Sequence, residues 1–252
     1  MAAGVLYFVV KQEKKRRARF LEMAKLSAKS LKKHMPYLRT ALFTDTGLDK
    51  IDYFDDIIHT KTPKKMWIYK WEECLMKSPY NPTLHLDADT YICDDFSEVF
   101  DMLNRFDLVT LMSPYHISDH KIKDVPICFP EPCGGFFLWK QNRKNDWLFK
   151  RIAELVRKKH WGRADEPSIR KALYESKVRY AFIPWEYTCV FRVPGYVFGK
   201  VKIMHGESCN IVTNAETFNQ NTERRVYTGE TLILTRKTQG KYVEMDQKIR
   251  YS

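Results

Sequence analysis

Leu84-His-Leu-Asp-Ala-Asp-Thr-Tyr-Ile92 is the stretch of the 252-residue sequence that says most about the fold. Thr83–Leu86, which overlaps its beginning and alternates polar and apolar residues, predicts a short strand buried in a sheet. Asp87 and Asp89 follow on the turn at the carboxyl end of that strand, separated only by the small residue Ala88. Carboxylates placed in this way can bind a hard divalent cation such as Mg²⁺ or Mn²⁺, although a solvated turn gives the same short pattern.

Strands and helices alternate on the N-terminal side of this stretch. Gly4–Val10 is a continuous run rich in β-branched and aromatic residues, which predicts a strand buried on both faces. Apolar residues recur at three- to four-residue spacing from Phe20 to Leu31, which predicts a helix over 14–33 with a cationic outer face. We also expect strands at Leu38–Thr44 and Asp56–Thr60 and a helix at Trp67–Met76. This alternation indicates a mainly parallel sheet covered by helices, with ligands bound beyond the carboxyl ends of its strands.

The second half of the sequence is less regular. In chain order we expect a strand at Leu108–Met112, a loop at His116–Pro130, a glycine-entered strand at Gly134–Trp139, helices at Trp147–Lys159 and Pro167–Glu175, and a hairpin of Thr231–Thr235 and Tyr242–Met245 around Gln239-Gly240. No internal repeat or Gly/Ser-rich linker divides the chain. The sequence therefore predicts a single α/β domain with an added C-terminal hairpin.

The charge of the chain is strongly positive. Its 43 Lys and Arg residues outnumber 31 Asp and Glu residues, so the formal net charge is +12 and the pI is near 9.3. Ten of these cations and only two acids lie between Lys11 and Lys33. Such a field attracts anions, which here means nucleic acid, an acidic membrane or phosphorylated small molecules. With 44% hydrophobic and 14% aromatic residues, the composition excludes a disordered chain.

Cysteines and apolar runs bear on the compartment. The six cysteines contain no C-x-x-C pair and a chain of this length needs no disulfides, so we expect reduced thiols, with Cys128 and Cys133 as small buried residues. The apolar run Gly4–Val10 is far shorter than the roughly 20 residues of a membrane span, and no basic segment precedes it as in a signal peptide. We therefore expect a cytoplasmic protein without a transmembrane segment.

Seven stretches in order resemble those of one enzyme family. They are Lys70 with Trp71–Leu75, Ser78–Tyr80, Leu84–Asp89, Val99–Leu103, Gly134–Trp139, Ala164–Pro167 and Lys202–Gly206. Together they resemble the GT-A fold glycosyltransferases that use nucleotide sugars. Closer similarity is to the glycogenin-like retaining branch and to compact glycosyltransferases of large algal DNA viruses (chloroviruses), which implies a viral protein in the host cytoplasm.

The resemblance implies a function and a set of site residues. The reaction would be a metal-dependent transfer of a hexose or pentose from a UDP-sugar to a hydroxyl of a glycan or glycoprotein, with retention. The donor would bind residues 1–112, and the acceptor half would be 113–252 with the C-terminal extension. Mn²⁺ or Mg²⁺ would be bound by Asp87, Asp89 and His205, the diphosphate by Lys70, and the sugar by Asp165 or Glu166. Position at the carboxyl ends of the first two strands predicts that Val9, Val10, Lys11 and Asp45 contact the rest of the donor, and we also expect contacts from Ala88 and Gly206. Cys133 stands where the family usually has an Asn.

Three other interpretations stay open at this point. Asp87-Ala-Asp-Thr90 also matches the D-x-D-x-T motif of haloacid-dehalogenase-type phosphatases, but that motif normally follows the first strand of its domain, and here several strands precede it. A basic nucleic-acid-binding protein is the second, yet the charged helix lacks base-stacking aromatic residues on its cationic face, so we expect no nucleic acid. His205 alone could also be a satisfied core residue.

Overall fold

The computed structural model describes residues 2–10, 13–61, 66–113, 121–158, 165–206, 210–227, 231–238 and 241–248. Lys11, which we expected to contact the donor, lies outside these residues. So do Ala164, the first residue of one family-like stretch, Cys209, residues 116–120 of the expected loop, Lys159 at the end of an expected helix, and the Gln239-Gly240 turn.

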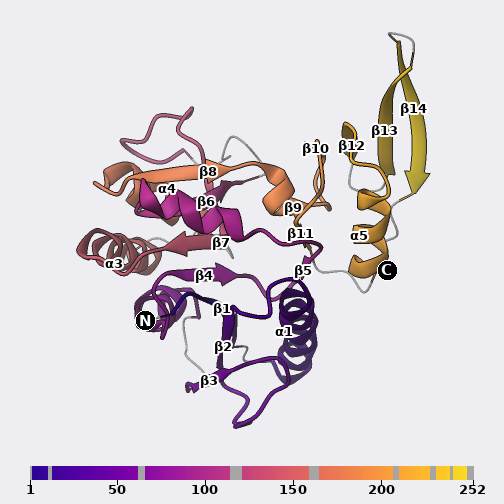
Figure 1. Cartoon of the computed structure of the whole chain (residues 1–252). Coiled ribbons are helices and arrows are strands. Elements are labelled where there is room, and N and C mark those ends of the chain that lie inside the picture. The colour runs from indigo at the N-terminus through magenta and orange to yellow at the C-terminus, as the bar shows by residue number, and fades with distance from the viewer. Residues whose placement is uncertain are drawn as a thin grey trace.

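A seven-stranded sheet forms the centre of the molecule, in the order β3-β2-β1-β4-β7-β6-β8 (Figure 1). Its strands are β1 Gly4–Val9, β2 Arg39–Thr44, β3 Asp56–His59, β4 Thr83–Leu86, β6 Leu108–Met112, β7 Pro132–Trp139 and β8 Tyr180–Ile183. All neighbouring pairs are parallel except those of β7, which runs antiparallel to β4 and β6. The expected mixed, mainly parallel sheet is therefore confirmed.

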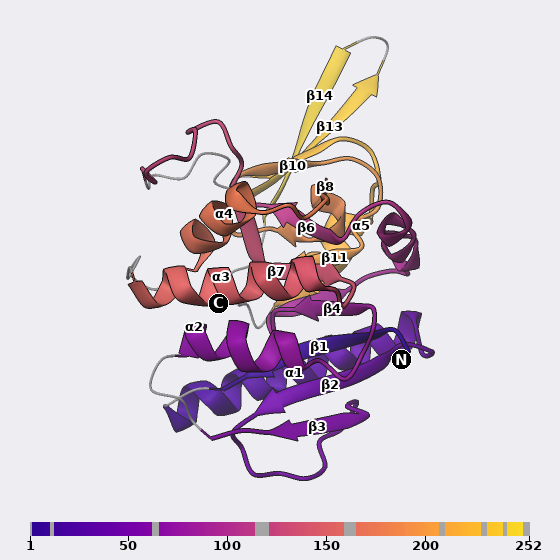
Figure 2. The ribbon, with the colours of Figure 1, turned by 90° about the vertical axis from the view of Figure 1, so that its left-hand side faces the viewer.

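Helices cover both faces of this sheet (Figure 2). The α-helices are α1 Lys14–His34, α2 Met66–Tyr69, α3 Arg143–Lys158, α4 Glu166–Glu175 and α5 Ile211–Asn219. Alternation along β1 shows how the two faces are filled: Val5, Tyr7 and Val9 join the cluster that contains α1, whereas Leu6 joins the cluster of Trp71 and α3. Because both faces of β1 are buried, its sequence is apolar throughout.

The helix expected at Trp67–Met76 is interrupted. α2 is followed by a π-helical turn, η1 Lys70–Cys74, and then by a 3₁₀ turn, η2 Leu75–Lys77. The wider turn brings Lys70, Trp71 and Cys74 to buried positions. π-Helical turns are rare and occur mostly at functional sites, and Lys70 is one of the residues expected to contact the donor.

Two smaller sheets stand at the carboxyl end of β4. One contains β5 Thr90–Ile92, β11 Ile203–His205 and β9 Cys189–Val190; the other contains β10 Gly195–Val197, β12 Arg225–Tyr227, β13 Thr231–Thr238 and β14 Lys241–Lys248. Short 3₁₀ helices lie at η3 Ser97–Asn104 and η4 Trp185–Tyr187. The expected C-terminal hairpin is confirmed as β13 and β14, which project from the rest of the molecule (Figure 1).

One expectation about the cysteines is wrong. Cys133 is buried as expected, but Cys128 is exposed. Cys128 lies in the segment between β6 and β7, where the buried guanidinium of Arg170 donates to the carbonyls of Pro126, Ile127 and Phe129. These hydrogen bonds fix the backbone of the segment against the protein interior, and the Cys128 side chain faces solvent. None of the helices among the described residues is both long and apolar enough to span a membrane.

Candidate metal centre

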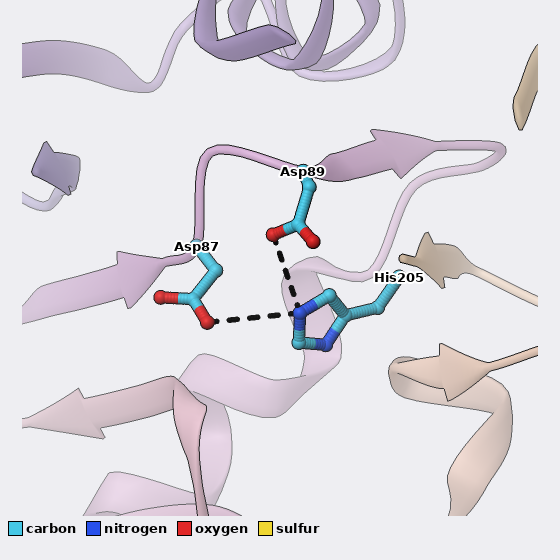
Figure 3. A group of neighbouring side chains, drawn as sticks. All are labelled: Asp87, Asp89 and His205. Atoms are coloured by element: carbon cyan, nitrogen blue, oxygen red, sulfur yellow. Dashed lines mark ion pairs between the residues drawn. The ribbon is translucent and has the colours of Figure 1, made fainter. Parts of the chain in front are cut away.

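Asp87, Asp89 and His205 meet at the carboxyl edge of the main sheet (Figure 3). Nε2 of His205 lies 3.6 Å from Oδ2 of Asp87 and 3.5 Å from Oδ1 of Asp89. One ligand atom from each residue lies within 4.8 Å of the others. Octahedral Mg²⁺ with ligands at about 2.1 Å puts neighbouring ligand atoms about 3 Å apart, so a small shift of these side chains would suit such an ion.

Strand pairing fixes the three ligands. Asp87 directly follows β4, and Asp89 directly precedes β5, which pairs antiparallel with β11 so that His205 lies opposite Thr90. The N–H of Gly206 donates to the carbonyl of Asp89 at 2.9 Å. Thr90 Oγ1 donates to the carbonyl of Asp87 at 2.9 Å. The D-x-D turn is thus held on one side by β4 and on the other by a histidine-bearing strand far along the chain.

Gly135 leaves space for two of the ligands. The N–H of Asp87 donates to the carbonyl of Gly135 at 3.1 Å, which places the glycine beside the Asp87 carboxylate. A Cβ at position 135 would lie 2.6 Å from Oδ2 of Asp87 and 2.6 Å from Cε1 of His205. Both contacts are far inside van der Waals distance. The second glycine of the predicted Gly134–Trp139 strand is therefore required for close approach.

Lys70 stands behind Asp87. Its Nζ donates to the carbonyl of Gly134 at 3.1 Å and lies 3.8 Å from Oδ1 of Asp87, and the residue is 2% exposed. Burial alone would lower the pKa of Lys70, but attraction first from Asp87 and then from Asp165 and Glu166 leaves the pKa raised. The ammonium group is therefore charged at neutral pH. For Asp87, burial acts against ionisation, but Lys70 and nearby histidines hold the pKa of its carboxyl well below the usual range.

His85 also contacts this group, and the sequence argument missed it. Its Nδ1–H donates to the carbonyl of Leu6 at 3.0 Å, and its Nε2 lies 3.5 Å from Oδ1 of Asp87. Burial, followed by the charge of Lys70, lowers the pKa of His85 below its ordinary value. The buried ring therefore packs beside Oδ1 of Asp87, the same oxygen that Lys70 approaches. A histidine in an otherwise apolar strand just before the carboxylates is the signal that could have indicated this role.

Comparison with solved structures places this geometry in a known fold. An active-site mutant of LgtC aligns with a TM-score of 0.54 at 13% identity, over 81% of this chain and 88% of that chain. Mouse xyloside xylosyltransferase 1 in its apo form gives 0.54 at 12% identity, over 84% of this chain and 99% of that chain. GlyE of Streptococcus pneumoniae TIGR4 gives 0.54 at 15% identity, over 82% of this chain, which spans 56% of GlyE.

The chain has the GT-A fold. No protein-family model matches the sequence, and no curated protein matches it significantly. Four strands, β1 to β4, precede the D-x-D turn in this sheet. The motif therefore does not follow the first strand, as the haloacid-dehalogenase interpretation would require.

Asp87, Asp89 and His205 fit a divalent cation. Two carboxylates and an imidazole are a ligand set of the kind Mn²⁺ accepts, and Mg²⁺ takes carboxylates as well. The Nε2 atom of His205 faces both carboxylates, as a shared ion would require. The glycine at position 135 leaves the space that these side chains occupy free of a Cβ.

Asp165 and Glu166 lie at the beginning of α4, close to the same glycines. The indole N–H of Trp71 donates to Oδ2 of Asp165 at 2.7 Å, and a Cβ on Gly134 would lie 3.2 Å from Oδ1 of Asp165. Burial, followed by the charge of Asp165, raises the pKa of Glu166 to about 7. Lys70 acts in the opposite direction on Glu166. Asp165 and Glu166 therefore lie close enough to Lys70 and Asp87 for their charges to interact.

The other residues expected to contact a donor lie at this edge but differ in what they can offer. Val9 and Val10 are 0% and 1% exposed, so neither residue presents surface to a ligand in this structure. The carboxylate of Asp45, at the end of β2, forms an ion pair of 3.1 Å with Arg17 of α1. Ala88 is buried within the D-x-D turn, and Gly206 has a φ of +150°, a conformation that favours glycine.

We expect Gly135→Ala to weaken Mn²⁺ binding by roughly a hundredfold, because the added methyl must displace Asp87 or His205. Isothermal titration of Mn²⁺ measures the change. Gly134→Ala is the matched control, since its Cβ would meet Asp165 and not the metal ligands. Equal Mn²⁺ affinity in the two variants would contradict the position assigned to the ion.

Metal binding at His205 should release a proton. Burial alone would lower the pKa of His205, but the charge of Asp89, a contact with its carboxylate and the Cys133 thiol raise it well above the ordinary value. In the metal-free protein, the protonated His205 ring stabilises the fold, and this contribution is lost as the pH rises above about 6.5 and through the raised pKa. Mn²⁺ binds only the neutral ring, so it competes with the proton. We expect Mn²⁺ affinity to increase by about tenfold per pH unit in that range. Titrations in buffers of different ionisation enthalpy count the proton, and a pH-independent affinity would contradict the assignment.

Proposed function

We propose that the protein is a metal-dependent glycosyltransferase that transfers a hexose or pentose from a UDP-sugar to a hydroxyl of a glycan or glycoprotein. The observation that carries this proposal is the group of Asp87, Asp89 and His205 at the carboxyl edge of a GT-A sheet, with the buried cation of Lys70 beside it. LgtC, one of the structures that aligns with this chain, is described as a galactosyltransferase in complex with donor and acceptor sugar analogs. We also propose that residues 1–112 bind the nucleotide-sugar donor and that residues 113–252 bind the acceptor.

Charge on the leaving group explains the arrangement. Breaking the bond between the sugar and the nucleotide leaves negative charge on the diphosphate, and a bound divalent cation would neutralise part of it. Lys70 adds a second fixed positive charge, because its ammonium is held by the carbonyl of Gly134 and cannot turn away. Fixed charges that match the developing charge lower the barrier more than they stabilise the bound substrate.

Asp165 and Glu166 are the proposed sugar-facing acids. Trp71 fixes the carboxylate of Asp165 through its indole N–H. A negative carboxylate beside the sugar ring favours the positive charge that develops on the sugar as its bond to the diphosphate breaks. Glu166, with a pKa of about 7, can gain or lose a proton near neutral pH, which suits a group that assists a hydroxyl.

Ligand-induced stabilisation tests the donor class. UDP-, GDP- and dTDP-sugars are added with and without Mn²⁺, and the unfolding temperature is followed, since ligands that bind the folded state raise it by mass action. We propose that UDP-sugars with Mn²⁺ give the largest shift. No shift with any sugar nucleotide, together with no release of UDP from UDP-sugars, would exclude the proposed function.

Retention of the anomeric configuration is a further prediction, and it rests on the similarity of Ala164–Pro167 and His205-Gly206 to the retaining branch. Proton NMR of the first product from an α-linked donor should show an α-linked product. A β-linked product would mean inversion, and Asp165 or Glu166 would then act as the base that accepts the proton of the acceptor hydroxyl.

A further inference from the structure

An open groove lies outside the metal centre, between η4 and β10. It has a volume of about 420 Å³ and is lined by Pro184, Trp185, Glu186, Gly195 and Tyr196. Small-molecule sites usually have volumes of about 300–1,000 Å³ and walls that are mostly apolar with a few fixed polar groups. The lining of this groove has the same composition: two aromatic rings, a proline, a glycine and one carboxylate.

Trp185 forms a rigid wall of the groove. Its ring packs against two of the core clusters, one around the main sheet and one around α5. A Cβ at position 195 would collide with the Trp185 ring and with the hydroxyl of Tyr227, so the backbone of Gly195 lies directly against both. Because β10 pairs with β12 through Gly195 and Tyr227, this contact is held by sheet hydrogen bonding. The ring therefore presents a preformed apolar surface.

Tyr196 and Glu186 provide the remaining features. The side chain of Tyr196 is 45% exposed, and the guanidinium of Arg224 lies 5.8 Å from its ring centre. The backbone N–H of Phe198 donates to Oε1 of Glu186, which fixes the carboxylate in the groove wall. The backbone carbonyl of Glu186 accepts from the N–H of Lys202, one residue before β11. The carboxylate is thus fixed through Oε1 alone, and the backbone of Glu186 is fixed separately through its carbonyl.

These features suit one class of ligand. A pyranose ring has an apolar face of C–H groups that stacks on an aromatic ring, and hydroxyls at its rim that donate to a carboxylate. The groove combines the fixed carboxylate of Glu186 with the guanidinium of Arg224 over Tyr196, so its charges do not favour an anionic ligand over a neutral one. A purely apolar ligand would leave that carboxylate without the donors it has in water. A neutral sugar satisfies both the rings and the carboxylate.

The groove is within reach of the metal centre. Val190 pairs with His205, and Trp185 precedes Val190 by five residues, which span at most about 17 Å. The paired strands themselves are about 5 Å apart. A chain of several sugar units can therefore lie in the groove and still place its terminal hydroxyl at the metal centre.

We propose that the groove between Trp185 and Tyr196 binds a neutral sugar unit of the acceptor glycan, remote from the hydroxyl that reacts. This proposal rests on the proposed function, because it is the acceptor of that transferase that the groove would bind. It predicts that short acceptors, which cannot reach the groove, are poorer substrates than long ones. It also predicts that the groove affects the acceptor and not the donor.

Direct binding tests the proposal without activity. Maltotetraose, cellotetraose, chitotetraose and mannotetraose are added at millimolar concentration, and saturation-transfer NMR is recorded on the wild type, on Tyr196→Ala and on Tyr37→Ala. Tyr37, 63% exposed, is a tyrosine outside the groove and serves as the control. We expect at least one tetrasaccharide to bind the wild type and the control equally and Tyr196→Ala about tenfold more weakly. Binding of none of the four, or equal binding to all three proteins, overturns the proposal.

A second variant keeps the test independent of the ring. Glu186→Gln preserves the shape of the side chain and an oxygen for the N–H of Phe198, so the fold should be retained. We expect it to weaken tetrasaccharide binding severalfold, because hydrogen bonds to a charged acceptor are stronger than those to an amide.

If sedimentation shows wild-type dimers that Tyr196→Ala abolishes, the groove is an interface between two copies of the chain, and the proposal is wrong.

Release of UDP onto water separates the two proposals. We expect Tyr196→Ala to hydrolyse UDP-sugars at the wild-type rate and to lose about tenfold in kcat/KM with the tetrasaccharide that binds, with little change for a monosaccharide acceptor. If glycan binding depends on Tyr196 but no UDP-sugar is hydrolysed or used, the proposed function fails and the groove stands as a sugar site. If UDP-sugars are hydrolysed but no glycan binds, the groove proposal fails alone.

Discussion

Asp89→Ala is expected to abolish Mn²⁺-dependent UDP binding and to reduce sugar transfer by roughly a thousandfold, because it removes one of the two carboxylates that would hold the ion. The fold should be retained. The Asp89 side chain lies on a turn at the sheet edge, and the carbonyl that accepts from Gly206 belongs to the backbone and remains. Isothermal titration of UDP with and without Mn²⁺ measures the effect, and urea unfolding measures the stability.

Asp52→Ala is the control for this experiment, since Asp52 is an exposed acid outside the site. It removes the same net charge from the strongly positive chain and should leave UDP binding unchanged. If Asp89→Ala binds UDP with the wild-type dependence on Mn²⁺, the metal assignment is wrong and the D-x-D sequence is only a turn.

Lys70→Met should affect both stability and transfer. The ammonium of Lys70 is 2% exposed and balances the charges of Asp87, Asp165 and Glu166, and methionine keeps its length without its charge. Removing one partner of a buried charge group costs about 3–5 kcal/mol in the free energy of unfolding. Since Lys70 lowers the pKa of Glu166, its loss should raise that pKa further and shift the pH profile of transfer toward alkaline values.

Lys77→Met is the matched control for Lys70, because Lys77 lies seven residues away in the same helical region with a side chain that is 64% exposed. Its ion pair with Glu73 is on the surface and should contribute about 0–1 kcal/mol. Equal midpoints of urea unfolding for the two variants would show that Lys70 does not hold the carboxylates together. Addition of Mn²⁺ should restore part of the lost stability in Lys70→Met, because the ion supplies positive charge beside Asp87.

The sequence predicted the elements whose patterns are local. The strands β1, β2, β3, β4 and β6 were expected within a residue or two, because buried strands are short apolar runs with clear ends. The D-x-D turn was visible for the same reason. Trp67–Met76 reads as a single helix, because nothing in side-chain spacing distinguishes an α-helical from a π-helical turn.

What the sequence could not predict depends on contacts between distant segments. Pairing of β11 with β5 brings His205 to the D-x-D turn, yet each of these strands is three residues long and has no usable periodicity. Only the resemblance to a family indicated the histidine. The roles of Gly135 and His85 follow from packing around Asp87. The exposure of Cys128 follows from the carbonyls to which Arg170 donates. The algal-virus resemblance and the cytoplasmic location stay predictions from sequence.

Asp89, just before β5, and His205, at the end of β11, give the candidate metal centre the topology of a cross-link. Asp89 and His205 are the ends of a very long chain segment, and an ion held by both would close it into a loop. Unlike a disulfide, the ion does not stay on the unfolded chain, so it stabilises the folded protein by binding only that state. Folding stability and ion affinity are therefore coupled through one thermodynamic cycle, and any substitution that loosens the packing of β11 on β5 weakens both together.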